Sequence, residues 1–335
     1  MVYIYKKLIQ GRPYYYLRMS KRVKNKTVVK DIAYLGYDIQ QVEKKIAKLP
    51  VRYKKDIRKA YRNIKKYIRS EHYVNKIKKL KLKKNPYIDK ELLDETEAIK
   101  LHFNKEFLKL DDRTIQEAYQ NFLINFAFNT TSLEGNTITL NETDKLLKEN
   151  LTPKNRTLRE VFDLKNTEKV FFEILDLKEK INHDLIIYLH DKLLENIDKR
   201  KGYRTHDIHV IRSHFKASPG IYVKTDMGLL LRWFAKYENK LHPLILAGLF
   251  HQKFEKIHPF PDGNGRTGRI LMNYILLKKR YPPLIIRMSR RGDYLDALSE
   301  GDKADSNEIN PKYFKKLIKY ISEDLIAGYW DNFLV

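Results

Sequence analysis

Apolar residues recur at a helical period along most of the chain that follows residue 90. In one clear case Ile115, Tyr119, Phe122 and Phe126 are spaced three or four positions apart, which places them on one face of a helix. The same period predicts helices over residues 92–109, 115–134, 158–177, 184–196, 225–239, 243–257, 265–279 and 311–327. The hydrophobic pattern therefore predicts a mainly α-helical body for this part of the protein.

The start of the chain shows a different pattern. Three β-rich stretches are separated by turn-forming residues and cover Val2–Ile9, Tyr14–Met19 and Thr27–Leu35. These stretches predict a three-stranded antiparallel meander. Beyond it, helical stripes predict one helix that reaches Leu49 and a second that follows Pro50 and continues to Ile68.

Charge divides the chain near residues 84–86. Residues 1–90 hold 28 Lys and Arg against 6 Asp and Glu, so they carry +22 of the total of +25. The remainder is nearly neutral and long enough to enclose a full hydrophobic core. We therefore expect a basic, tyrosine-rich N-terminal extension over residues 1–90 and one globular domain over residues 91–335.

Composition excludes several classes of site. The chain has no cysteine, which rules out disulfides, thiolate zinc sites and a cysteine nucleophile. Most of its histidines lack a metal-ligand spacing such as H-E-x-x-H. No apolar stretch reaches the roughly 18 residues that predict a membrane-spanning helix, and the first residues do not form a signal peptide. We therefore expect a cytoplasmic protein without a membrane partner.

The basic extension has two interpretations. Its lysine-rich helix faces and its tyrosines would suit the phosphates of a nucleic acid and the stacking of its bases. The alternative is a solvated, lysine-rich surface of the kind common in heat-adapted proteins. Charge alone gives affinity without identifying what is bound, so the sequence leaves both interpretations open.

The run HPFPDGNGRTGR at residues 258–269 combines groups that handle phosphates. The helix predicted before it should end near His258, because Pro259 follows directly and Pro261 lies two positions further on. Gly263 and Gly265 permit backbone conformations in which successive N–H groups converge on an anion at the start of the next helix. Arg266 and Arg269 lie one turn apart on that helix, and two such side chains suit two phosphates.

This run resembles the signature of the Fic family, H-x-F-x-(D/E)-G-N-G-R-x-x-R, at every constrained position. The resemblance implies a Fic-type helical bundle with a β-hairpin flap. It also implies transfer of AMP from ATP to a hydroxyl of a protein, which is called AMPylation. In that scheme His258 is the general base and Asp262 holds Mg²⁺ between the α- and β-phosphates. The remaining residues that the resemblance assigns to the nucleotide are Gly263, Asn264, Gly265, Arg266, Arg269, Asn273 and Tyr274, of which the last two would line the adenine pocket.

A segment at about 208–223 resembles the flap of this family. Short β-branched runs on either side of polar residues predict a hairpin, with Ile221 to Val223 in its second arm. The resemblance implies that the flap holds the target protein by adding a β-strand to it. The residues expected to contact the target are Ile211, Ser213, His214 and Phe215.

A second motif, TTSLEGN at residues 130–136, ends the predicted helix at about 115–135. Alone it is an ordinary glycine-terminated helix end. Together with the first motif it resembles the inhibitory helix of many Fic proteins, (S/T)-x-x-x-E-(G/N), in the subclass where that helix precedes the catalytic motif. The resemblance implies that Glu134 pairs with Arg269, displaces it from the γ-phosphate and so inhibits the enzyme. The same glutamate would position water if the enzyme also removes AMP.

Three functions are therefore considered. The first is an adenylyltransferase that uses ATP and Mg²⁺ and is inhibited by Glu134. The second is a nucleic-acid-associated regulator whose Fic fold senses a nucleotide with little turnover. The third is a Fic enzyme with a different donor, such as UTP or CDP-choline. A nucleotide sensor needs no base at His258, so the histidine favours an enzyme. The anion loop matches the family signature at every constrained position, which favours ATP as the donor. The sequence therefore favours the adenylyltransferase.

Overall fold

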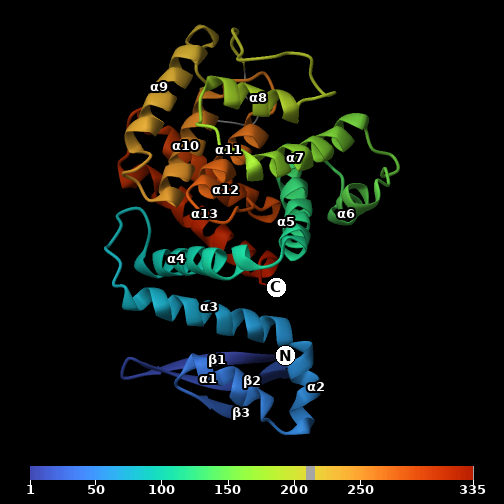
Figure 1. The fold of residues 1–335 in the computed structure, drawn as a ribbon, viewed down its shortest axis with the longest axis vertical. Helices are drawn as coiled ribbons and strands as arrows, with labels where there is room; N and C mark the ends of the chain where they lie inside the picture. The colour runs from blue at the N-terminus through green and yellow to red at the C-terminus, as the bar shows by residue number, and fades with distance from the viewer. Residues whose placement is uncertain (209–215, 335) are drawn as a thin grey trace.

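The computed structural model describes residues 1–208 and 216–334. The protein is mainly helical and carries a small antiparallel sheet at its N-terminus, as the sequence predicts. In Figure 1 the sheet lies at one end of an elongated molecule and the larger helical body at the other, with α3 between them. None of the described helices is both long and apolar enough to span a membrane.

The predicted meander is confirmed. Strands β1 (Val2–Ile9), β2 (Arg12–Val23) and β3 (Lys26–Gly36) pair in the order β1-β2-β3 and are antiparallel. Gly11, Lys24 and Asn25 adopt positive φ in the two turns, the backbone geometry that tight hairpin turns require. Alternate side chains of each strand therefore point to opposite faces of the sheet.

Three helices follow the sheet: α1 (Ile39–Ala47), α2 (Val51–Lys59) and α3 (Tyr61–Lys79). The single helix expected after Pro50 is wrong, because the chain bends at Ala60, which ends α2 and precedes α3. The apolar period continues across that bend. A change in the direction of the helix axis therefore could not be predicted from the period.

Helix α3 contributes side chains to two separate hydrophobic cores. Its first half contributes Ile64 and Ile68 to the core beneath the sheet. Its second half contributes Tyr73 and Ile77 to the core of the helical body. The boundary expected near residues 84–86 remains a prediction, and the division between the two cores lies earlier in the chain.

The helical body is built around α10, which is buried along nearly its whole length. It packs against α9, α11, α12 and α13. The helices of the body are α4 (Lys90–Lys105), α5 (Asp112–Ser132), α6 (Leu140–Glu149), α7 (Leu158–Asp176), α8 (His183–Leu193), α9 (Val223–Tyr237), α10 (Pro243–Ile257), α11 (Asn264–Lys278), α12 (Arg291–Asp302) and α13 (Pro311–Asn332). Short 3₁₀ helices lie at Phe107–Lys109, Gly220–Tyr222 and Met288–Arg290.

Two of these helices, α6 and α12, were not among the sequence predictions. Helix α6 begins with a capping box in which Thr139 and Glu142 satisfy each other's backbone N–H groups, a signal that the sequence did contain. Helix α12 buries Tyr294, Ala297 and Gly301. Two of those three residues are small, so they form no apolar stripe that a period could reveal.

The expected hairpin is only partly within the described residues. Ile211, Ser213, His214 and Phe215 lie outside them. The second arm is wrong as a strand, because Gly220–Tyr222 forms a 3₁₀ helix that leads directly into α9. Asp207 fixes this turn by accepting a hydrogen bond from the Gly220 N–H at 2.7 Å.

Candidate active site

The loop between α10 and α11 carries the motif of residues 258–269, and its own side chains hold it in place. His258 ends α10 in the left-handed conformation (φ 53°), and Gly263 (φ 75°) precedes α11. The Asn264 side chain accepts a hydrogen bond from the Phe260 N–H at 2.8 Å and donates one to its carbonyl at 2.7 Å. Both polar atoms of the Asn264 side chain are therefore used within the loop. A phosphate at the start of α11 would meet the backbone N–H of Asn264 instead.

Phe260 anchors the same loop in the core. Its ring is fully buried and stacks on His190 with 3.6 Å between centroids and 3° between planes. His190 Nε2 also lies 3.1 Å from the Asp262 carbonyl, and a carbonyl can only accept, so this nitrogen donates. Helix α8 therefore supports the loop through both apolar and polar contacts.

Arg204 holds the loop from the other side, and sequence reasoning assigned it no role. It is 3% exposed. Its guanidinium donates to the carbonyls of His258 (2.8 Å), Ile257 (3.2 Å) and Ser218 (2.6 Å). These bonds satisfy the carbonyls at the end of α10. Its partners lie up to 54 positions away, so no local spacing could have identified it.

The His258 imidazole is in the form that can accept a proton. Its Nδ1 lies 3.3 Å from the Glu255 carbonyl. Since that carbonyl can only accept, Nδ1 carries the hydrogen and the lone pair is on Nε2. Burial lowers the pKa of His258 below its usual value, against the opposing effects of the Glu255 carbonyl and Glu134. The ring is therefore neutral at pH 7 and able to accept a proton.

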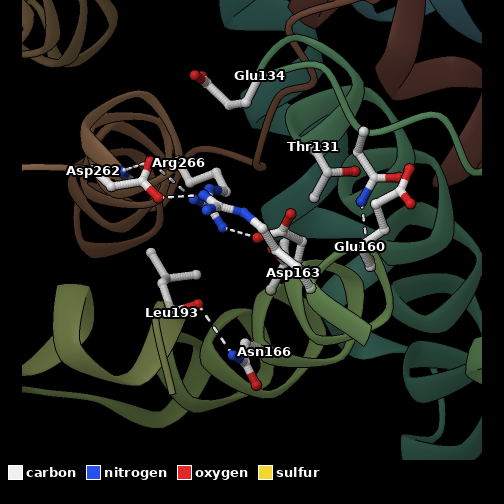
Figure 2. A network of polar contacts seen from close by, with 12 residues as sticks. Thr131, Glu134, Glu160, Asp163, Asn166, Leu193, Asp262 and Arg266 are labelled. Carbon is white, nitrogen blue, oxygen red and sulfur yellow. Dashed lines mark hydrogen bonds and ion pairs between the residues drawn. The ribbon is translucent and has the colours of Figure 1, made fainter. Parts of the chain in front are cut away.

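Asp262 lies in a network of alternating charges (Figure 2). Its carboxylate accepts a hydrogen bond from the Gly263 N–H at 2.6 Å, forms an ion pair with Arg159 and lies 3.6 Å from Arg266. Arg266 is buried and also pairs with Asp163 of α7. Burial alone would raise the pKa of Asp262, but Arg266 and Arg159 outweigh it, so the pKa is lowered. The carboxylate is therefore ionised and available to a cation.

Arg269 is bound to the end of α5. It donates to Glu134 Oε1 at 2.7 Å, to Thr130 Oγ1 at 2.7 Å and to the Thr130 carbonyl at 2.9 Å. Burial would raise the pKa of the Glu134 carboxyl, but Arg269 and, to a lesser extent, Arg266 hold it below its usual value. The charged pair connects side chains that lie 135 positions apart.

The Glu134 carboxylate also covers the N-terminus of α11. A Cβ added at Gly265 would lie 2.0 Å from Glu134 Oε1, so only glycine allows this approach. The first N–H groups of a helix lack partners within the helix and attract anions. Glu134 therefore places a negative charge where the sequence predicts phosphates.

Two residues expected to line the adenine pocket are fully buried. Asn273 is fully buried, donates to the carbonyls of Arg269 and Leu284, and accepts from the Leu284 N–H. Tyr274 is also fully buried and donates to the Glu179 carbonyl at 2.6 Å. Both side chains hold neighbouring segments inside the core, and their expected contact with adenine stays a prediction.

A metal ion would have one protein carboxylate here. In residues 1–208 and 216–334 no three His, Asp or Glu side chains gather closely enough to hold an ion among themselves. Mg²⁺ in nucleotide sites commonly binds one or two carboxylates, and phosphates and water supply the other ligands. The ionised Asp262, beside a helix start that attracts phosphates, fits that pattern.

Comparisons with known proteins agree with this geometry. Residues 180–276 match the model of the Fic/DOC family. The protein adenylyltransferase Fic of Nematostella vectensis is 32% identical over 223 residues, which cover 65% of this chain and 50% of that protein. The Drosophila melanogaster protein of the same name is 32% identical over 203 residues, 58% of this chain and 39% of that protein. The chain thus spans half or less of the length of these relatives.

Solved structures show the same fold. A Fic-domain signalling protein from Bacteroides thetaiotaomicron superposes with a TM-score of 0.62 at 25% identity, over 69% of this chain and 93% of that one. Fic-1 of C. elegans, residues 134–508, superposes with a TM-score of 0.60 at 23% identity, over 73% of this chain and 71% of that one.

Proposed function

We propose that this chain, which contains a Fic/DOC-family domain, is a protein adenylyltransferase that transfers AMP from ATP to a Ser, Thr or Tyr hydroxyl of a protein. The observation that carries the proposal is the placement of a neutral imidazole, an ionised carboxylate and two buried arginines around one helix start. The relatives named adenylyltransferases support the same activity.

The chemistry follows from these positions. The target hydroxyl oxygen attacks the α-phosphorus, and its proton passes to Nε2 of His258. The bond between the α-phosphorus and its bridging oxygen breaks, and pyrophosphate leaves. The first N–H groups of α11, with Arg266 and Arg269, stabilise the negative charge of the phosphates. Asp262 would hold Mg²⁺, which would offset part of the negative charge of the phosphates.

A transfer experiment with the full chain tests the proposal. The purified protein is incubated with a cell lysate, Mg²⁺ and ATP labelled either on the α- or on the γ-phosphate. We expect only the α-label to enter protein. Label from the γ-phosphate would indicate phosphorylation instead. Better transfer from UTP or CDP-choline would support another donor, and binding without transfer would support a nucleotide sensor.

We further propose that the contact between Glu134 and Arg269 inhibits the enzyme. A guanidinium presents one planar fork and makes one bidentate pair at a time. Arg269 already uses its fork on Glu134 and Thr130, so it cannot also bind a γ-phosphate. The Glu134 carboxylate, which lies over Gly265, would also repel phosphates from the start of α11.

The lowered pKa of His258 predicts the pH at which kcat/KM falls on the acid side. A base acts in its deprotonated form, so kcat/KM should fall as the pH drops through the pKa of His258 in the folded enzyme. Because burial lowers that pKa, we expect the fall below the ordinary histidine value of about 6.5. Measuring kcat/KM against pH in the Glu134→Gly variant removes the opposing effect of Glu134. A midpoint above that ordinary value would contradict the assignment.

Asp262→Asn should raise the Mg²⁺ concentration required for ATP binding and lower the transfer rate. The amide keeps an oxygen that can accept the Gly263 N–H but loses the charge that attracts the ion. Calorimetry of ATP binding at increasing Mg²⁺ measures the first effect independently of turnover. Asp144→Asn, on α6, removes a partly exposed carboxylate that pairs with Lys148 and is the control. Unchanged Mg²⁺ dependence in Asp262→Asn would assign the ion to another ligand.

A further inference from the structure

One face of the N-terminal sheet lies away from the helices that pack on it. The opposite face carries the buried side chains of Val2, Ile4, Tyr15 and Leu17, which form a core with α1 and α3. Because side chains alternate along a strand, the neighbouring positions point the other way. The residues on this face, here called the open face, include Tyr3, Tyr5, Tyr14, Tyr16, Arg18 and Tyr34.

Strand pairing arranges the open face in rows. Tyr5 pairs with Tyr16, and Tyr16 pairs with Tyr34, so three tyrosines cross the whole sheet side by side. In the row on one side Tyr14 pairs with Lys7, and in the row on the other side Arg18 pairs with Tyr3. The face is therefore a surface of phenol rings with Lys7 on one side and Arg18 on the other.

The rings are arranged as a platform. Tyr34 lies 5.3 Å from Tyr16 and 6.3 Å from Tyr14 between centroids. The Arg18 guanidinium lies 3.3 Å from the centre of the Tyr5 ring. These contacts hold the rings together, while Tyr34 remains 50% exposed. Ordering such rings on binding costs little conformational entropy, because they are already packed against each other.

The charge of this part of the chain selects the class of partner. Residues 1–90 carry 28 Lys and Arg against 6 Asp and Glu. On the open face Lys7 is exposed, whereas Asp31 offsets the charge of Arg18 at 2.5 Å. The N-terminal part therefore attracts polyanions, and the open face offers them aromatic surfaces as well.

We propose that the open face binds single-stranded nucleic acid. Unpaired bases can lie on the Tyr16 and Tyr34 rings of the row, since Arg18 already lies over Tyr5, while phosphates meet Lys7 and other lysines of residues 1–90. Sequence-tolerant single-strand binders use this combination of rings and cations. In a duplex the faces of the bases are already stacked on each other, so a duplex could use only the cations. Both DNA and RNA strands offer bases and phosphates, and the face should bind them alike. The proposal does not depend on AMP transfer.

The test uses the full chain and fluorescence anisotropy. The probes are a labelled strand of about 20 thymidines, the matching uridine strand and a duplex of the same length, all longer than the roughly 4–16 nucleotides that one such surface covers. We expect both single strands to bind more tightly than the duplex at low salt. Equal or tighter binding of the duplex, or no binding of either strand, would overturn the proposal.

Two pairs of variants separate the rings from the charge. Tyr34→Ala should weaken single-strand binding about 10-fold or more, the scale of one lost stacking contact. Tyr61→Ala, which removes an exposed tyrosine from α3, should not. Tyr34→Phe should retain binding because its ring still stacks. Equal losses in Tyr34→Ala and Tyr61→Ala, or none in either, would contradict a role for the tyrosine row.

The second pair concerns the phosphates. Log affinity for a single strand falls with log salt by about 0.7 for each phosphate contact. Lys7→Ala should therefore reduce this slope by about 0.7 over about 50–200 mM salt. Lys54→Ala removes the same charge from an exposed position on α2 and should leave the slope unchanged. Identical slopes in the two variants would show that binding is spread over the basic surface and would overturn the proposal.

Discussion

We expect His258→Ala to lower the rate of AMP transfer by about 100- to 10,000-fold, the usual contribution of a positioned base. In the proposed mechanism the imidazole accepts the proton of the target hydroxyl and does not hold the phosphates, which would lie at the start of α11. ATP affinity should therefore remain near that of the unchanged protein. Single-turnover transfer of α-labelled AMP measures the first effect, and calorimetry with ATP measures the second.

The backbone at His258 suggests a second variant for the same test. His258 has a φ of 53°, which alanine tolerates less well than asparagine. His258→Asn therefore removes the base with less strain on the loop, and thermal unfolding of both variants checks that the fold survives. His72→Ala, in α3, is the control for loss of a histidine elsewhere. Transfer at the original rate in a folded His258→Asn protein would exclude His258 as the base.

The second large effect is expected from Glu134→Gly, which should raise AMP transfer. The contact at 2.7 Å between Glu134 and Arg269 must break before that arginine can bind a γ-phosphate. If the pair contributes about 1.4 kcal/mol against productive binding, the rate rises about 10-fold. Glu117→Ala removes an exposed carboxylate from α5, the helix that ends just before Glu134, and should leave transfer unchanged.

A double variant separates release of Arg269 from a general effect of the mutation. Arg269→Ala should depress transfer both alone and together with Glu134→Gly, because the γ-phosphate then lacks its partner in either case. The two changes should therefore be non-additive. Arg269→Lys keeps a charge in this buried position but loses the fork, and it guards against misfolding as the cause. If Glu134→Gly left ATP affinity and rate unchanged, Glu134 would be an ordinary helix-end residue.

The sequence predicted what depends on neighbours along the chain. The meander follows from β-rich runs between turn residues, and α10 and α11 follow from an apolar period interrupted by Pro259 and Gly263. The motif at residues 258–269 could be recognised because its groups lie on one short loop. Their spacing in the chain nearly sets their spacing in the molecule. Even the ordinary helix end at residues 130–136 was visible from its glycine.

Only the tertiary structure decided which segments meet. A hydrophobic period identifies the buried face of a helix but not the element that covers it. The structure therefore supplied Asp163 as the partner of Arg266, and Arg204 as the support of the loop. It also showed that Asn273 is buried, although the resemblance placed it in the adenine pocket. These contacts join residues far apart in the chain, so they depend on how the helices pack, which no local pattern records.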